Sequence, residues 1–110
     1  MPPDDPKFDS APQTGSAAVA EPAVQVKKPQ LYKVLLHNDD YTTMEFVVMI
    51  LMTVFHHDEP SSVSVMLQVH QKGVGVAGVY SFEMAESRIS KVTRLAKENE
   101  FPLRCSMEPD

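Results

Sequence analysis

Three polar residues, Asn38, Asp39 and Asp40, interrupt an otherwise apolar stretch of the chain. Strand-forming residues precede them, and an apolar segment that begins at Met44 follows them. Because carboxylates are rarely buried unless they are paired or hydrogen bonded, these two acids either face water or hold a cationic group. Asn and Asp also favour turns, so the triplet alone is equally consistent with a turn and with a binding site.

His70 follows Met66 by one helical turn, which would place both side chains on one helix face. If His70 lies close to Asn38 and Asp39, three hydrogen-bond acceptors surround one point. A free α-amine is an ammonium with three donors, and such acceptors would hold it through charge-assisted bonds of about 1.5 to 3 kcal/mol each. An acetylated nitrogen could not satisfy them. The surplus apolar residues would line a pocket beside the amine for a large apolar side chain: Met44, Val47, Met66, Val69 and Leu103.

Six secondary-structure elements are expected to position these residues. The alternation of apolar residues over 31–36 predicts a strand that ends at His37, and the nearly continuous apolar run over 44–55 predicts a helix that is covered on both sides. A second helix is predicted over 60–72, a strand over 74–80, an amphipathic helix capped by Ser81, and a last strand around 103–107. The predicted order is β-α-α-β-α-β.

Local signals predict where two of the helices begin and end. Thr42 and Glu45 have the spacing of a capping box, and Tyr41 and Phe46 occupy the flanking positions of a hydrophobic staple. Gly73 is expected to end the second helix in a left-handed conformation.

Small and flexible residues give two expectations about packing. Gly75 and Gly78 predict that a helix packs closely against the second strand. Met49 and Met52 are predicted to fill the core.

Length and composition limit the class of protein. A chain of 110 residues with 43% hydrophobic residues supports one small domain, predicted over 30–110. Residues 1–29 hold six prolines and few large apolar residues, and are predicted to be a disordered extension. The single cysteine suits a reducing, cytoplasmic location. No apolar run is long enough to span a membrane. The formal charge of −5 argues against nucleic acid as a partner.

Several segments together closely resemble the ClpS family, adaptors that hand N-degron substrates to the ClpAP protease. The segments that carry the resemblance are His37–Thr42, Met44–Val47, Met66–Leu67, Val69–Gln71 and Gly73. The resemblance implies an α+β open sandwich, in which a three-stranded antiparallel sheet packs against three helices. It also implies a non-catalytic adaptor without cofactor or metal. Its expected substrates are proteins with an N-terminal Leu, Phe, Tyr or Trp, and its expected partner is the N-terminal domain of the ClpA unfoldase.

The resemblance implies roles for individual residues. Asn38, Asp39 and His70 correspond to residues that contact the substrate α-amine, and Asp40 is taken as a supporting acid. The residues that shape the side-chain pocket correspond to Thr42, Met44, Val47, Met66, Val69 and Leu103. Met44 stands at the position that excludes β-branched Ile and Val, whose rigid χ1 would press a branch against it.

The resemblance also assigns a second surface and shows one departure. Glu83 and Arg88 match charged positions that dock onto ClpA, although charges on an exposed helix usually only aid solubility. The segment 1–29 corresponds to an extension that engages the unfoldase during delivery. Thr43 stands where the family usually has a proline at the first helical position.

Two other classes of function compete with the adaptor. An enzyme or metal protein could use the histidines and acids, but no His-Glu-x-x-His, cysteine pair, phosphate loop or nucleophile elbow is present, and His56–His57 is interpreted as a polar loop. Phosphoacceptor receiver domains need more repeated βα units than this chain can supply. A structural module like the C-terminal domain of the ribosomal stalk protein would share the architecture without an amine site, so fold alone does not decide the function.

Overall fold

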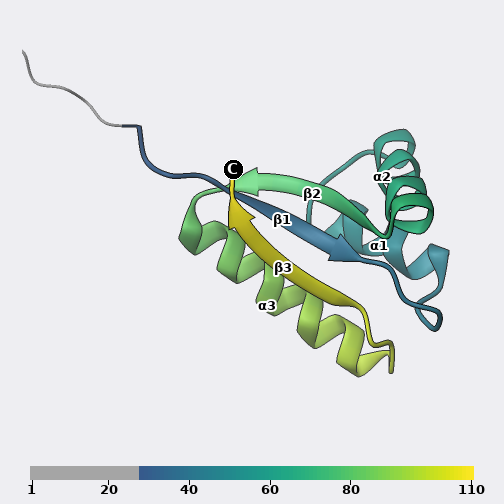
Figure 1. Ribbon diagram of the computed structural model, residues 1–110. Helices are drawn as coiled ribbons and strands as arrows, with labels where there is room; N and C mark the ends of the chain where they lie inside the picture. Colours follow the sequence, from purple (N-terminus) through teal and green to yellow (C-terminus); the bar gives the residue numbers. More distant parts are fainter. Residues whose placement is uncertain (1–27) are drawn as a thin grey trace, which may run out of the picture.

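A computed structural model of the protein describes residues 28–110, and its elements follow the predicted order (Figure 1). They are β1 (Tyr32–His37), α1 (Met44–Thr53), α2 (Glu59–Lys72), β2 (Val74–Tyr80), α3 (Phe82–Glu98) and β3 (Arg104–Pro109). The predicted extension over 1–29 lies outside the described residues except for its last two. Within residues 28–110, none of the helices combines the length and the hydropathy that a membrane span requires.

The three strands form one antiparallel sheet in the order β2-β1-β3, so β1 is central. Val34 and Leu36 of β1 are completely buried, whereas Lys33 and Leu35, which alternate with them, point to the other face. The pairing of β1 with β2 shifts between Val34 and Leu35, which leaves Ala77 as an extra residue in a β-bulge.

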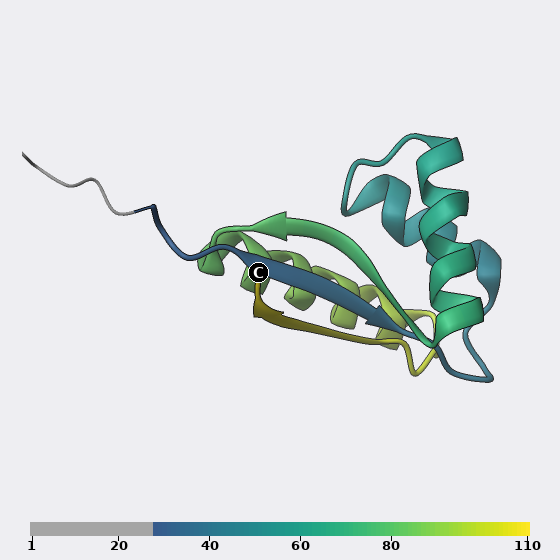
Figure 2. The ribbon, with the colours of Figure 1, turned by 45° about the horizontal axis from the view of Figure 1, so that its top comes forward.

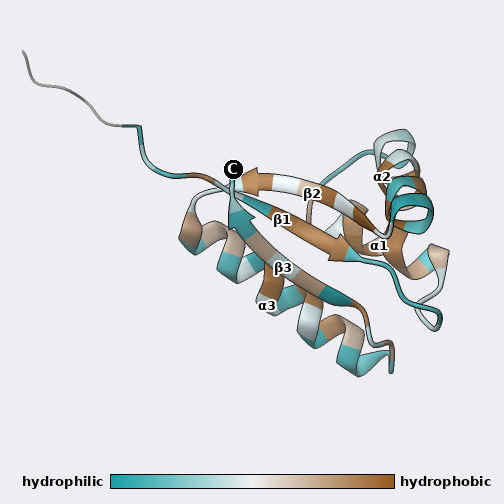
Figure 3. Ribbon diagram, viewed as in Figure 1, coloured by the Kyte–Doolittle hydropathy of each residue, from teal (hydrophilic) through white to brown (hydrophobic). Residues whose placement is uncertain are grey.

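The helices cover one face of this sheet and one of its ends. Figure 2 shows α3 running along the sheet, with α1 and α2 grouped beside the end where β1 stops and β2 begins. In Figure 3, β1 and much of α1 are hydrophobic, while hydrophobic and hydrophilic residues alternate along α3. The core joins these layers, and the ring centroids of Phe46 in α1 and Phe101 before β3 lie 4.8 Å apart. The predicted α+β open sandwich is confirmed.

The start of α1 differs from the prediction by one residue. Thr43, not Thr42, is the N-cap, and its hydroxyl accepts a hydrogen bond from the N–H of Phe46 at 3.1 Å. Asp39 explains the difference, because it holds Thr42 in the preceding turn through the Thr42 N–H and hydroxyl. The predicted staple also fails, since Tyr41 is 78% exposed.

The end of α1 and the burial of one of its methionines also differ from the prediction. The helix stops at Thr53, and Val54 and Phe55 are buried beyond its end. Met49 packs against the core as predicted, but Met52 is 40% exposed, so its predicted core role is wrong. A helix this apolar still has one side facing water.

The glycine predictions hold at the junction of α2 and β2. Gly73 ends α2 with φ 85°, in the left-handed conformation that glycine tolerates best. A Cβ on Gly75 would lie 2.8 Å from Cγ2 of Val69, so the close neighbour is α2, as predicted. At Gly78 the neighbour is the ring of Tyr80 in the same strand, not a helix.

Candidate functional site

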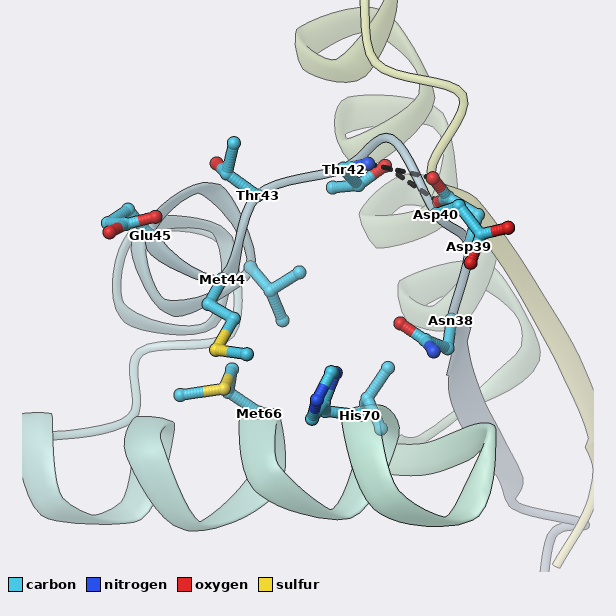
Figure 4. A pocket seen from close by; sticks show the side chains of 11 residues that line it. Asn38, Asp39, Asp40, Thr42, Thr43, Met44, Glu45, Met66 and His70 are labelled. Atoms are coloured by element: carbon cyan, nitrogen blue, oxygen red, sulfur yellow. Dashed lines mark hydrogen bonds between the residues drawn. The ribbon is translucent and has the colours of Figure 1, made fainter.

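A cavity of about 480 Å³ lies between the loop after β1, the start of α1 and one face of α2 (Figure 4). Its lining residues are Asn38, Asp39, Asp40, Thr42, Thr43, Met44, Glu45, Val47, Met66, Val69 and His70. The structure therefore brings together the two segments, about 30 residues apart, whose side chains were expected to converge.

Asp39 organises the loop that forms one wall of this cavity. Its Oδ1 accepts hydrogen bonds from the backbone N–H groups of Tyr41 at 2.8 Å and Thr42 at 2.7 Å, and its Oδ2 accepts one from the Thr42 hydroxyl at 2.7 Å. Burial acts to raise the pKa of Asp39, but the hydrogen bonds from Thr42 and Tyr41 outweigh it and lower the pKa. Asp39 is thus a turn-forming carboxylate that keeps one acceptor site on Oδ2 available to a ligand.

Asn38 and His70 face each other because β1 is tied to the end of α2. The Asn38 N–H donates to the carbonyl of Gly73 at 2.9 Å, and the Gly73 N–H donates to the carbonyl of Val69 at 2.9 Å. Figure 4 shows the Asn38 amide and the His70 ring directed toward the open centre of the cavity. Neither side chain has a hydrogen-bond partner among the described residues, so both are free to bind a ligand.

The opposite part of the cavity is apolar. Val47 and Val69 are buried, with 6% and 2% of their surface exposed, and form its inner wall. Met44 and Met66 lie side by side at its edge in Figure 4. Unbranched thioether side chains adapt their shape to a guest more readily than branched ones.

The polar lining has a negative balance. Asp39, Asp40 and Glu45 are its acids, and it contains no Lys or Arg. Within the residues that the structure describes, no three His, Cys, Asp or Glu residues gather as metal ligands. The cavity therefore offers acceptors and negative charge next to an apolar wall, which suits a cation attached to an apolar group.

Most of the predicted pocket residues line this cavity, with one exception. Leu103 is not among the lining residues and lies in the core with 6% of its surface exposed. Thr43 and Glu45 line the cavity without having been predicted. Their position on either side of Met44 was the signal that could have identified them.

The other histidines lie outside the cavity and have structural partners. His37 Nε2 lies 2.7 Å from Ser106 Oγ, which links β1 to β3. His57 lies in the loop between α1 and α2, as predicted, but it is half-buried, with Nδ1 2.7 Å from Ser61 Oγ and Nε2 2.6 Å from the carbonyl oxygen of Ala77. A carbonyl only accepts, so Nε2 carries the proton and His57 ties the α1–α2 loop to the bulge in β2.

The two charged residues predicted to dock onto a partner lie on α3 in different settings. Glu83 is exposed in the first turn. Arg88 is half-buried, its guanidinium carbon lies 5.6 Å from the centroid of the Tyr80 ring, and its Nε is buried without a hydrogen-bond partner in the described part of the chain. Arg88 therefore packs on Tyr80, unlike an ordinary solvated charge.

Comparison with known proteins places these features in one family. The family model described as "ATP-dependent Clp protease adaptor protein ClpS" matches residues 27–106. A ClpS adapter protein of Myxococcus xanthus is 58% identical over 89 residues, covering 81% of this chain and 83% of the relative. A ClpS adapter protein of Desulfatibacillum aliphaticivorans is 53% identical over 92 residues, covering 84% and 88%.

A solved structure agrees with these relatives. It is that of Agrobacterium tumefaciens ClpS2 bound to L-phenylalaninamide, which is 42% identical and matches with a TM-score of 0.73, over 76% of this chain and 100% of the other. The fold, the matched segment and the identities agree, and the chain belongs to the ClpS family of adaptor proteins of the ATP-dependent Clp protease, which are not enzymes.

Proposed function

We propose that this chain binds proteins that carry a destabilising N-terminal residue, and delivers them to the ClpAP protease in the cytoplasm. The preferred first residues are Leu, Phe, Tyr and Trp. The observation that carries the proposal is the cavity itself, in which the unpartnered Asn38 and His70 face each other beside a buried apolar wall. The related ClpS2 bound to L-phenylalaninamide, a molecule with a free α-amine and a phenyl group, supports the same chemistry.

The α-amine is proposed to bind at the polar end of the cavity. Its three N–H donors would be shared among the Asn38 side-chain oxygen, the free acceptor site of Asp39 and a ring nitrogen of His70, with Asp40 adding negative charge nearby. Acetylation removes both the charge and two of the donors. A substrate with a blocked N-terminus is therefore expected to be rejected.

The first side chain is proposed to enter the apolar part of the cavity, between Val47, Val69 and Met66, with Thr42 at the rim. Burying a large aliphatic or aromatic side chain there contributes roughly 1.5 to 3 kcal/mol. Met44 lies at the edge of the cavity, where a Cβ branch of Ile or Val would press against it. Leu103, a core residue outside the lining, is proposed to act indirectly, through the packing of the core that Val47 and Val69 share with it.

Delivery is proposed to use the exposed Glu83 and the Tyr80-packed Arg88 on α3 as a docking surface for the N-terminal domain of ClpA. The cavity and this docking surface use different elements, so substrate binding and docking can be altered separately.

The test is fluorescence anisotropy with labelled peptides that differ only in the first residue, with an N-acetylated Phe peptide as a control. Leu, Phe, Tyr and Trp peptides are expected to bind, Ile and Val peptides weakly, and the acetylated peptide not at all. His70→Ala should weaken Phe-peptide binding at least tenfold, the effect of losing about 1.4 kcal/mol. Gln71→Ala, an exposed neighbour on α2 outside the cavity lining, should leave it unchanged.

A degradation assay with ClpAP and a Phe-headed reporter separates binding from delivery. Glu83→Lys should slow degradation but keep peptide affinity, while the exposed Glu86→Lys on the same helix should keep both. If none of the free-amine peptides binds, the adaptor proposal is wrong and a purely structural role replaces it.

A further inference from the structure

A second hollow of about 400 Å³ adjoins the first cavity at Met44 and Met66. Its lining residues, from the first turns of α1 and from α2, are Met44, Glu45, Val48, Glu59, Val63 and Met66. Met44, Glu45 and Met66 also line the first cavity, so the two hollows share a wall. We call the second hollow the α1–α2 groove.

The α1–α2 groove combines an apolar floor with two carboxylates. Val48 and Val63 are half-buried, and Met44 leaves 43% of its surface exposed. Glu45 and Glu59 are both exposed, and neither forms an ion pair with another described residue. Each also lies in the first turn of a helix, where an acid is favoured by the helix dipole, so the acids alone would not indicate a ligand.

The apolar floor and the two carboxylates together indicate which kind of side chain would fit the groove. The side chains of Lys and Arg have an apolar stem that packs on apolar surface and a charged end that stays in water or meets a carboxylate. A purely apolar guest would leave the two carboxylates unused, and an acidic guest would be repelled by them. A basic side chain satisfies both parts of the groove.

We propose that the α1–α2 groove binds the side chain of a Lys or Arg at one of the two positions that follow the N-terminal residue of a substrate. The inference rests on the proposed function, because the first residue must occupy the neighbouring cavity. A residue in an extended chain advances about 3.3 Å, so the second and third residues of a substrate stay close to the cavity that holds the first, and Met44 and Met66 line both hollows. The shared wall thus links recognition of the first residue to recognition of the next ones.

The test uses labelled peptides that begin Phe-Ala-Ala, Phe-Lys-Ala, Phe-Ala-Lys and Phe-Glu-Ala, and are otherwise identical. One of the two Lys peptides should bind about three- to fivefold more tightly than Phe-Ala-Ala, the gain expected from one exposed ion pair with some stem burial. Glu59→Lys should abolish this gain and favour Phe-Glu-Ala instead. Glu59 is the better residue to change, because Glu45 also lines the first cavity.

Glu86→Lys is the matched control, because it makes the same charge change on an exposed position of α3. It should leave the gain from Lys intact. If Glu59→Lys and Glu86→Lys reduce the gain equally, the preference comes from the overall charge of the protein and the proposal is wrong; it is also wrong if neither Lys peptide gains affinity. Failure of Phe-Ala-Ala itself to bind would instead refute the proposed function.

Discussion

At the level of single residues, the adjacent acids Asp39 and Asp40 differ in their hydrogen bonding. Both line the cavity, but only Asp39 accepts hydrogen bonds from other described residues, three in all. From the residue types alone the two acids look alike, and only the family resemblance gave Asp39 the amine contact and Asp40 a supporting role. The turn that Asp39 holds places Asn38 on one side of the cavity and Thr43 at the start of α1.

We therefore predict that Asp39→Ala destabilises the protein more than Asp40→Ala does. Losing three hydrogen bonds at a turn should lower the free energy of unfolding by about 1 to 2 kcal/mol, in the range of a lost helix cap. Asp40→Ala should cost less than about 0.5 kcal/mol, as surface changes usually do. Urea titration of the two variants measures the difference, and equal losses would show that Asp39 does not hold the turn.

At the scale of elements, the junction of α2 and β2 fixes the cavity. α2 ends at Gly73 and β2 begins at Val74, so helix and strand fold back on each other without a loop. Gly75 lets Val69 approach the strand closely, and Val69 is at once a core residue and part of the cavity wall. Packing of these two elements and the shape of the cavity are therefore coupled.

Gly75→Ala tests this coupling. Its Cβ would lie 2.8 Å from Val69 Cγ2 and 3.3 Å from the backbone oxygen of Val65, so α2 would have to move. We predict a loss of about 1 to 3 kcal/mol in the free energy of unfolding, as for overpacked cores, together with weaker binding of Phe peptides.

A double-mutant cycle supplies the control for Gly75→Ala. In a Val69→Ala background the nearest clash is gone, so Gly75→Ala should lower the free energy of unfolding by less than it does in the wild type. An unchanged cost in the Val69→Ala background would mean that the strand backbone, and not the contact with Val69, carries the effect.

Elements with strong local signals could be predicted from the sequence alone. The end of α2 at Gly73 and the start of α3 at Ser81 follow from backbone preferences that act within a few residues. The strand β2 was predicted at its observed bounds. The start of α1 was missed because the side chain of Asp39 competes with the helix for Thr42. The role of His57 was missed because its partner Ala77 is 20 residues away, in a bulge that only the folded sheet creates.

The site was predictable to the extent that the family resemblance and helical spacing specify it. Met66, Val69 and His70 share a helix face, and that face does line the cavity. The α1–α2 groove had no such signal, because Val48 and Val63 come from two helices whose relative placement depends on tertiary packing.

At the scale of the whole molecule, the helices leave one face of the sheet without a covering layer among the described residues. Polar side chains hold part of this face together: Nε2 of His37 lies 2.7 Å from Ser106 Oγ, and Nη2 of Arg104 lies 3.5 Å from His37 Nδ1. Arg104 only donates, so Nδ1 is the acceptor and the proton sits on Nε2, which donates to Ser106. The central strand β1 is thus tied to the edge strand β3 by a neutral histidine.

Protonation of His37 should weaken the whole fold as the solution becomes acidic. Burial, and then the charge of Arg104, lower the pKa of His37 from its ordinary value of 6.5. Near and below that value the unfolded chain binds more protons at this site than the folded chain, so the free energy of unfolding rises with pH there. The contribution of His37 is complete above 6.5 and is lost as the pH falls from 6.5 through the folded-state pKa.

Urea titrations between about pH 7.5 and about pH 5.5 should therefore show falling stability in the wild type and a weaker fall in His37→Gln. His56→Asn is the matched control, because His56 is exposed, has no hydrogen-bond partner among the described residues, and has a positive φ of 59° that Asn tolerates. That variant should keep the pH dependence of the wild type. If His37→Gln keeps it as well, the acid sensitivity belongs to another group, and the link between β1 and β3 does not depend on a neutral imidazole.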